Sequence, residues 1–429
     1  MLKLLIRSAQ IINEGVSFEG SVLVDRGTIQ GVYAGLQLPP PEIAGDADTL
    51  DATGLLLLPG VIDTHVHFRD PGLTHKGTWS SESRAAVAGG VTSVADMPNT
   101  LPQTVSIAAL QEKNAIAAQS SLTNYYCYIG ATAGNIDLIA KLTKNDAFAV
   151  KLFMGSSTGN MLLSDDKLLN RLFAECPLPI VAHCENEDMI RQNTERYKSL
   201  YGAQIPFSMH PQIRSEEACY TSTEKAVALA KKHGAQLHVA HVSTARELTL
   251  LSKDEAKITA ETCPHYLWFC DEEYAAKGAF LKCNPAIKSS ADRATLRRAV
   301  ASGTIAAIAT DHAPHTIDEK QNSYLNAPSG LALIQHSLVS MLELARQGFF
   351  SAETVVEKMC HAPARIFNMR NRGFIRAGYA ADLVLVNPCA LWQATNENTL
   401  HKCGWSAFAG QTFSHKVTHT FVNGKLVYS

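Results

Sequence analysis

Two histidines one residue apart, followed by an arginine, form the first group of residues in this sequence with a spacing suited to chemistry. They are His65, His67 and Arg69 in the segment DTHVHFRDPG. In a β-strand, residues i and i+2 point to the same face, so both imidazoles would share one face, with Arg69 beside them if the strand continued. Imidazoles bind divalent metals such as zinc, and a guanidinium pairs bidentately with a carboxylate. The segment therefore predicts a metal site beside an anion site.

Further ionisable and amide side chains stand where later apolar runs end. They are Asn99, Lys151, His183, His241, Asn284, Asp311 and His315. A lone histidine is more often a packing residue than a ligand, so these residues gain meaning only if the fold brings them together. His238 and His241 lie three apart, which puts them on opposite faces of a continuous strand. We expect His241, which lies nearer the end of its strand, to be the one that points inward.

Eight short apolar runs recur along the chain, with helix-like stretches between them. The runs cover residues 60–68, 90–99, 124–132, 148–157, 179–186, 236–244, 258–266 and 305–315. Two of the intervening stretches, STEKAVALAKKHG and SADRATLRRAVASG, open with serine and close with glycine, as capped helices do. Strands that alternate with helices indicate a parallel sheet, and eight such units predict a (β/α)₈ barrel with its chemistry at the C-terminal strand ends.

The two ends of the chain show a different pattern, of short strands and turns. We expect residues 1–55 and 371–429 to pair into one small β domain that is discontinuous in sequence, around a barrel of residues 56–370. Neither end is long enough to bury a good core alone. The alternative is two separate hairpins at the edges of the barrel.

The charged residues at the strand ends predict a centre with two metals. Four histidines (His65, His67, His183 and His241) and Asp311 are too many ligands for one catalytic zinc, which needs three and an open position. Two metals need a bridging anion, and Lys151, alone in an apolar strand, is the residue best placed to supply it. Burial among cations favours its neutral amine, which can react with carbon dioxide to give an anionic carbamate. The alternative for Lys151 is a buried salt bridge.

Composition excludes several other classes of protein. The 429 residues carry 38 Lys and Arg against 40 Asp and Glu, a net charge of −2, which gives no nucleic-acid footprint. No apolar run approaches the roughly 20 residues of a membrane span, and the N-terminal segment does not resemble a signal peptide. The ten cysteines include no C-x-x-C pair. We therefore expect a cytoplasmic protein with free thiols.

The combined motifs resemble the amidohydrolase superfamily and, within it, the dihydroorotases of the long-chain type. The matching segments are HVHFRDPG, MPNT and DHAPHT. The resemblance implies that His65, His67 and Asp311 bind one zinc ion, that His183 and His241 bind a second, and that carboxylated Lys151 bridges them. It further implies that Arg69, Asn99 and His315 hold the substrate carboxylate and that Asn284 contacts the pyrimidine ring. The segment NAPSGLALIQHSL lacks the Gly-Leu-Glu-Thr of many members, which leaves the ring contacts in that loop open.

The activity implied is the reversible cyclisation of N-carbamoyl-L-aspartate to L-dihydroorotate in pyrimidine biosynthesis. A hydroxide bridging the two metals would attack the ring amide, with Asp311 as general acid and base. The alternatives are an allantoinase or a dihydropyrimidinase or hydantoinase, whose substrates lack that carboxylate, and a non-catalytic homologue, which the complete ligand set disfavours. The expected partner is a small molecule, with no nucleic acid and no membrane, and a homodimer is the family-based expectation.

Overall fold

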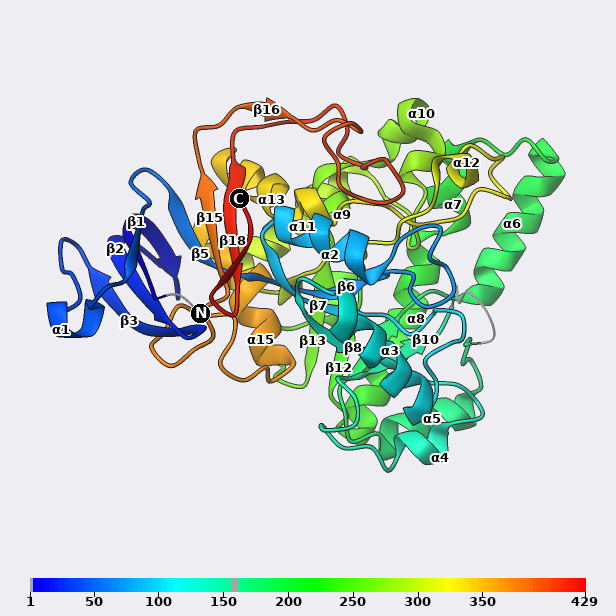
Figure 1. Ribbon diagram of the computed structural model, residues 1–429. Coiled ribbons are helices and arrows are strands. Elements are labelled where there is room, and N and C mark those ends of the chain that lie inside the picture. Colours follow the sequence, from blue (N-terminus) through cyan, green and yellow to red (C-terminus); the bar gives the residue numbers. More distant parts are fainter. Residues whose placement is uncertain (1–2, 156–160) are drawn as a thin grey trace.

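A barrel of parallel strands, surrounded by helices and flanked by a second sheet, makes up the computed structural model, which describes residues 3–155 and 161–429 (Figure 1). All eight predicted runs contribute a barrel strand. The strands are β6 (Val61–Val66), β7 (Val91–Asp96), β8 (Asn124–Cys127), β9 (Ile129–Gly130), β10 (Val150–Phe153), β11 (Ile180–His183), β12 (Leu237–Val239), β13 (Ile258–Thr262) and β14 (Ala307–Ile308). Residues 156 and 157 of the fourth run lie outside the described residues. β8 and β9 form one path, because Tyr128 between them still donates its N–H to the Asp96 carbonyl of β7 (3.1 Å).

The barrel closes where the chain after β14 meets β6. Thr310 donates its backbone N–H (3.0 Å) and its hydroxyl (2.6 Å) to the carboxylate of Asp63. The N–H of His67 donates to the carbonyl of His312 (2.8 Å). Burial raises the pKa of Asp63 to about 6, and the Thr310 hydrogen bonds oppose that shift. The C-terminal ends of the first and eighth strands therefore meet, which confirms the predicted (β/α)₈ barrel.

Helices cover the outside of the barrel and supply several of its loops. The longer ones are α2 (Trp79–Ala88), α3 (Ile107–Ser120), α5 (Asp166–Glu175), α6 (Glu187–Tyr201), α8 (Glu216–His233), α11 (Ser290–Ser302) and α13 (Ser337–Arg346). The shorter ones are α1 (Pro41–Ala44), α4 (Ile136–Ile139), α7 (His210–Ile213), α9 (Pro264–Trp268), α10 (Tyr274–Lys277), α12 (Ile317–Lys320), α14 (Ala352–Val356) and α15 (Ala362–Ile366).

Both predicted glycines, Gly234 and Gly303, end their helices, whereas both predicted serine caps are wrong, Ser290 by only one residue. Ser289 accepts the Asp292 N–H at the start of α11, and Gly303 ends that helix in the left-handed conformation (φ 93°). The helix expected to open at Ser222 instead begins at Glu216, because Ser215 accepts the Ala218 N–H there. Acidic residues in the first turn also suit the helix dipole, so the helix starts earlier and Ser222 is buried within it.

The two ends of the chain form one sheet, as predicted. Its strands are β1 (Leu4–Asn13), β2 (Val16–Asp25), β3 (Thr28–Ala34), β4 (Asp48–Asp51), β5 (Leu56–Pro59), β15 (Leu383–Asn387), β18 (Lys416–Val422) and β19 (Lys425–Tyr428). Their order within the described residues is β19-β18-β15-β5-β1-β2-β3, with β4 also paired to β1. The alternative of two separate hairpins is therefore wrong, because β5 joins the N-terminal strands to the C-terminal ones. The division into 1–55, 56–370 and 371–429 stays a prediction, and β5, at the start of the middle range, belongs to this sheet.

The chain between β15 and β18 leaves the sheet and passes over the barrel (Figure 1). It contains β16 (Trp392–Gln393) and β17 (Thr412–Phe413), which pair with each other. Trp405 and Phe408 are buried in the same hydrophobic cluster as the barrel strands. The indole of Trp405 donates to the carbonyl of His315 (2.7 Å). Part of the predicted C-terminal β segment thus supports the catalytic end of the barrel.

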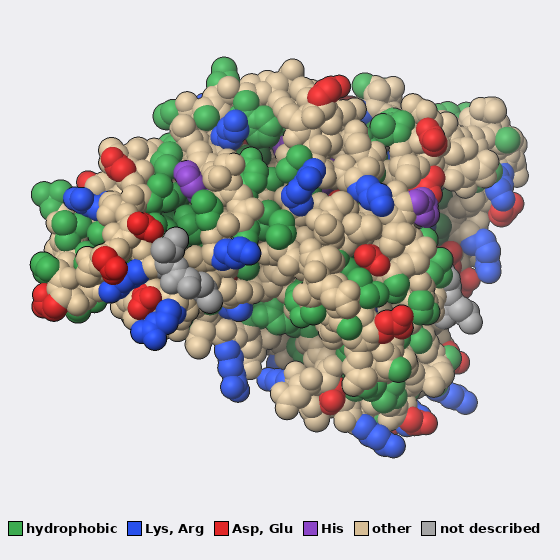
Figure 2. Space-filling model, viewed as in Figure 1, with side chains coloured by type: hydrophobic (Ala, Val, Ile, Leu, Met, Phe, Trp, Pro, Cys, Tyr) green, Lys and Arg blue, Asp and Glu red, His purple; other side chains and the backbone are tan. Residues whose placement is uncertain are grey.

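The surface agrees with the composition. Acidic and basic side chains are interspersed over the face seen in Figure 2, as the net charge of −2 leads one to expect. Across the described ranges, the helices are too short or too polar for any of them to span a membrane.

We expect Asp382 to hold the terminal sheet to the barrel. Its buried carboxylate pairs with Arg372, accepts the amide of Asn124 on β8 (3.0 Å) and accepts the N–H of Asn423 after β18 (2.7 Å). Asp382→Ala should lower the free energy of unfolding by about 2–4 kcal/mol, because several buried groups lose their partner. Urea denaturation measures this, with the exposed Asp46→Ala as the matched control, and equal stability of the two variants would contradict the assignment.

Candidate metal centre and substrate cavity

A small cavity of about 90 Å³ lies at the C-terminal ends of the barrel strands. Its lining includes all ten residues singled out from the sequence: His65, His67, Arg69, Asn99, Lys151, His183, His241, Asn284, Asp311 and His315. Phe153, Ala313, Ser329 and Gly330 complete the wall. The fold thus brings together residues that lie far apart along the chain. Their individual roles remain predictions.

His65, His67 and Asp311 form a cluster in which one ligand atom of each lies within 4.8 Å of the others. The Asp311 Oδ1 atom is 3.3 Å from Nε2 of His65 and 3.0 Å from Nε2 of His67. Burial lowers the pKa of His67 to about 4, so its imidazole is neutral near pH 7. Two imidazoles and a carboxylate are a donor set that fits a divalent transition metal.

Each histidine of this cluster is oriented through its other nitrogen. Nδ1 of His65 lies 2.5 Å from Oε1 of Glu261, and Nδ1 of His67 lies 2.8 Å from Oδ1 of Asn99. Carboxylate and amide oxygens accept, so a proton on each Nδ1 would leave each Nε2 free to bind a metal placed between it and Asp311. Such partners fix the tautomer of a metal-binding histidine. Asn99, expected at the substrate carboxylate, therefore also positions His67.

A second pair of histidines faces the same cavity. His183 Nδ1 and His241 Nε2 are 2.8 Å apart. The other nitrogen of His183 lies 2.9 Å from Glu185, which also pairs with Arg214. Nδ1 of His241 is buried without a hydrogen-bond partner within the described residues.

Lys151 projects from β10 into the cavity wall, where its ammonium is buried and has no hydrogen-bond partner within residues 3–155 and 161–429. Burial lowers the pKa of Lys151 to about 8, although Glu261 and Asp311 oppose the shift. The alternative of a buried salt bridge is not found in that part of the chain. An orphaned amine with a lowered pKa fits the carbamate chemistry expected from the sequence.

Arg69 and His315 form a cationic side of the cavity. Nη2 of Arg69 lies 3.1 Å from Nε2 of His315, and its Nε donates to the carbonyl of Pro314 (3.1 Å). Arg69 is buried, and burial lowers its pKa to about 10, so the guanidinium remains charged. No ion pair of Arg69 with a carboxylate occurs among the described residues. A buried cation of this kind requires an anion from elsewhere.

The path of the backbone to these residues differs from the predicted one. β6 ends at Val66, so Arg69 does not extend a strand; it takes a left-handed φ of 69° and still lines the cavity. His241 and Asp311 also have positive φ, 40° and 50°. A strand period of two therefore does not apply to these positions.

The same irregularity corrects the expectation for His238. β12 ends at Val239, and His238 reaches Glu261 (3.1 Å) while His241 lines the cavity, so both histidines join one network. Glu261 and Glu185 are functional residues that the sequence analysis missed. Glu185 stands two residues after the candidate His183, and Glu261 lies in the apolar run of residues 258–266, but nothing in the sequence shows which histidine each carboxylate reaches. Burial alone would raise the pKa of Glu261, yet His65 and His238 hold it well below its usual range.

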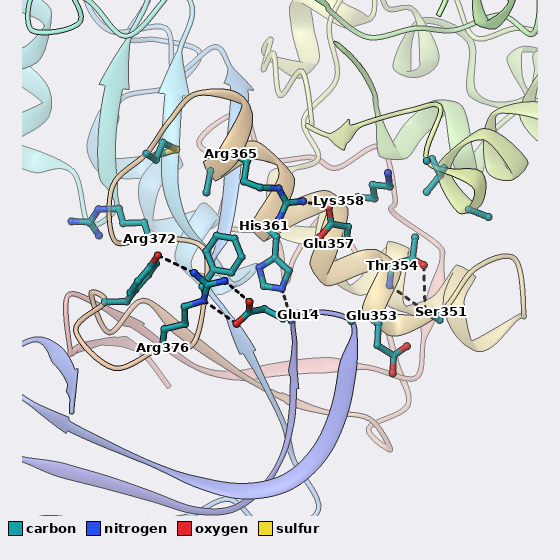
Figure 3. A pocket seen from close by; sticks show the side chains of 18 of the residues that line it. Glu14, Ser351, Glu353, Thr354, Glu357, Lys358, His361, Arg365, Arg372 and Arg376 are labelled. Carbon is teal, nitrogen blue, oxygen red and sulfur yellow. Dashed lines mark hydrogen bonds and ion pairs between the residues drawn. The ribbon is translucent and has the colours of Figure 1, made fainter. Parts of the chain in front are cut away.

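A larger cavity, of about 970 Å³, lies between the terminal sheet and α14–α15 (Figure 3). Four of its charged side chains form ion pairs: Arg376 pairs with Glu14, and Arg365 pairs with Glu357. His361 has both nitrogens bound, to the Glu14 N–H and to the Gly373 carbonyl. The small cavity, where cations and orphaned nitrogens lack such partners, is therefore the candidate site.

Known proteins resemble this chain in sequence and in fold. The pattern of the amidohydrolase family matches residues 56–427. A dihydroorotase from Halobacterium salinarum is 35% identical over 388 residues, which cover 86% of this chain and 89% of that protein. An allantoinase from Streptomyces avermitilis is 31% identical over 436 residues, covering 99% and 95%. The solved structure of an L-hydantoinase (dihydropyrimidinase) from Arthrobacter aurescens has a TM-score of 0.93 at 26% identity, covering 100% of this chain and 96% of that one.

We expect Glu261 to be needed for metal affinity. Glu261→Gln should weaken zinc binding by about 10–100-fold, because a neutral amide holds the His65 imidazole less firmly and lowers its basicity. Competition with a chelating dye measures the dissociation constant, and exposed Glu112→Gln on α3 is the matched control. Wild-type affinity in the Glu261 variant would remove the role given to it.

Proposed function

The chain belongs to the amidohydrolase family, and from this premise we propose that it is a dihydroorotase, which interconverts L-dihydroorotate and N-carbamoyl-L-aspartate. The observation that carries the proposal is Arg69, a buried guanidinium that faces the cavity and has no carboxylate partner among the described residues. L-dihydroorotate has a ring carboxylate that would pair with it. Hydantoin, dihydrouracil and allantoin have none. A buried cation left unpaired costs free energy, so the site favours the charged ring.

The residues of the cavity fit a pair of divalent cations. His65, His67 and Asp311 would hold one, and His183 and His241 would hold the other, with Lys151 as a carbamate between them. The support is the set of neutral imidazoles, the orphaned Nδ1 of His241 and the orphaned Nζ of Lys151. Bound zinc ions would lower the pKa of a water and polarise a carbonyl oxygen.

The chain's own residues would then bind, orient and move protons. Arg69, Asn99 and His315 would anchor the substrate carboxylate, with Asn284 at the ring. This anchoring sets the ring amide against the carboxylate of Asp311. In ring opening, Asp311 would take a proton from the attacking water and deliver it to the departing ring nitrogen. In ring closure it would return a proton to the expelled water.

A second candidate, allantoinase, is supported by the relative of that name, which covers almost the whole chain. Its substrate is an uncharged ring, so it gives Arg69 no partner. We therefore rank it below dihydroorotase. A non-catalytic role would require a loss of ligands, whereas all the expected ones line the cavity.

The test is turnover of purified, zinc-supplied protein with L-dihydroorotate, beside hydantoin, dihydrouracil and allantoin. We expect turnover of L-dihydroorotate alone. Arg69→Ala should raise its KM by about 10–100-fold, since a charge-assisted hydrogen-bonded pair is lost. Exposed Arg191→Ala on α6 is the control. Turnover of an uncharged ring only, or an unchanged KM in the Arg69 variant, would overturn the proposal.

Lys151 should carry a carbamate in the metal-loaded protein. Native mass spectrometry in bicarbonate buffer should show the added mass of one carbon dioxide, which acidification removes. Lys151→Ala should lose both that mass and part of the bound zinc, and short carboxylic acids should restore activity by replacing the carbamate. An unmodified Lys151 in active protein with two zinc ions would count against this bridge.

A further inference from the structure

His315 lies among three charged side chains, and their arrangement decides which of its nitrogens carries the proton. Nδ1 of the imidazole is 2.9 Å from the ammonium of Lys76 and 3.7 Å from a carboxylate oxygen of Glu319. Nε2 is 3.0 Å from the carbonyl of Ser329 and 3.1 Å from the guanidinium of Arg69. Burial, together with the charges of Arg69 and Lys76, keeps the pKa of His315 well below its usual value, so the ring is neutral.

The two neutral tautomers satisfy these neighbours unequally. With the proton on Nε2, the ring donates to the Ser329 carbonyl and Nδ1 accepts from Lys76, so two of the three close contacts are hydrogen bonds and only the one with Arg69 brings two donors together. With the proton on Nδ1, that N–H faces an ammonium, its nearest acceptor is 3.7 Å away, and the Ser329 carbonyl loses its donor. An ammonium has three donors and no acceptor, so Lys76 excludes the second tautomer.

We infer that Lys76 is a positioning residue that holds His315 in the Nε2–H tautomer, so that this N–H, which donates to the Ser329 carbonyl in the structure, can be shared with the substrate carboxylate. The inference rests on the proposed function and deepens it. In this tautomer the Nε2–H of His315 and the Nη2 of Arg69 are two donors side by side, 3.1 Å apart. Two adjacent donors repel each other until an anion lies between them, and a carboxylate accepts from both.

Lys76 is itself fixed in place by its neighbours. Its ammonium pairs with Glu319 Oε1 (3.0 Å), and only 13% of its side chain is exposed. Glu319 in turn completes the capping box at the start of α12, where Thr316 is the N-cap. Gly330 borders the imidazole at Cδ2, because a Cβ atom placed on Gly330 would approach His315 Cδ2 to 2.9 Å. In this orientation of the ring, the tautomer is set by the groups that each ring nitrogen meets.

Removal of Lys76 should invert this arrangement. In Lys76→Met, Glu319 becomes the only charged group beside Nδ1, and it is an acceptor. The proton would then move to Nδ1, and Nε2 would accept from Arg69. A lone pair on Nε2 would face the substrate carboxylate, and one guanidinium donor would be engaged elsewhere.

The first test is spectroscopic and needs no substrate. Protein labelled with ¹⁵N-histidine is compared as wild type, Lys76→Met and Lys76→Arg, with the His315 signals assigned by their loss in His315→Gln. We expect an unprotonated Nδ1 and a protonated Nε2 in the wild type and in Lys76→Arg, and the reverse in Lys76→Met. The same tautomer in wild type and Lys76→Met would overturn the inference.

The second test is kinetic. Lys76→Met should raise the KM for L-dihydroorotate by about 10–100-fold, since one charge-assisted hydrogen bond is lost, with kcat changed less than about threefold. Lys76→Arg should restore the KM because it still donates to Nδ1. Lys402→Met is the matched control. Lys402 is an exposed lysine that donates to the carbonyl of Thr74 and does not contact His315. Zinc content and the melting temperature should match the wild type in every variant.

If the charge of Lys76 acted on substrate binding without setting the tautomer of His315, the KM and the ¹⁵N signals would respond differently in a double variant. In the double variant Lys76→Met, Glu319→Gln, the local net charge equals that of the wild type, and the new side-chain amide at position 319 can donate to Nδ1. Recovery of both the Nε2–H signal and the KM supports the tautomer, whereas recovery of the KM without the signal overturns it. If the wild type fails to turn over L-dihydroorotate, the proposed function fails. The ¹⁵N signals would still show which nitrogen of His315 carries the proton.

Discussion

The seam between the first and eighth barrel strands is the contact on which the site depends. Asp63 accepts two hydrogen bonds from Thr310, a residue 247 positions later in the chain. This contact fixes the next residue, Asp311, against the histidines that follow Asp63. Without closure, the carboxylate and the two imidazoles would belong to opposite edges of an open sheet. Closure therefore does more than complete the barrel, because it assembles the cluster of two histidines and one aspartate from both ends of the strand order.

Around this cluster, each histidine is held through the nitrogen that it does not turn to the cavity. Glu261 holds His65, Asn99 holds His67, and Glu185 holds His183. The two glutamates are buried and ionised, which is costly unless cationic or hydrogen-bonding groups surround them. Their presence is physically consistent with a site that gains positive charge when it binds metal. Among the described residues, this network stays incomplete at Nζ of Lys151, at Nδ1 of His241 and at Oε1 of Glu185.

The sequence predicted the strands and the cavity residues well, because both depend on local signals. Short apolar runs that end in histidine, asparagine or aspartate predict buried strands with polar C-terminal ends, whatever the later packing. It did not predict Glu261 or Glu185, since a glutamate beside a histidine in the chain gives no information on a contact across strands. His238 was misjudged because a strand period was applied through a residue with a left-handed backbone, His241. The start of α8 was misjudged because Ser222 and Ser215 are equally good caps by residue type, and only burial separates them.

The cavity has two chemically different halves, and this division separates the chemistry of the reaction from the choice of substrate. One half contains the cluster of His65, His67 and Asp311, a candidate metal site that fits membership of the amidohydrolase family, with His183, His241 and Lys151 beside it. The other half, with Arg69 and His315, is cationic and lacks an anion of its own among the described residues. A metal centre can hydrolyse many cyclic amides, but a buried guanidinium is stable only opposite a negative charge. Under the proposed function, the second half would therefore make the choice of substrate, because the charge of Arg69 and the proton of His315 would select a carboxylate.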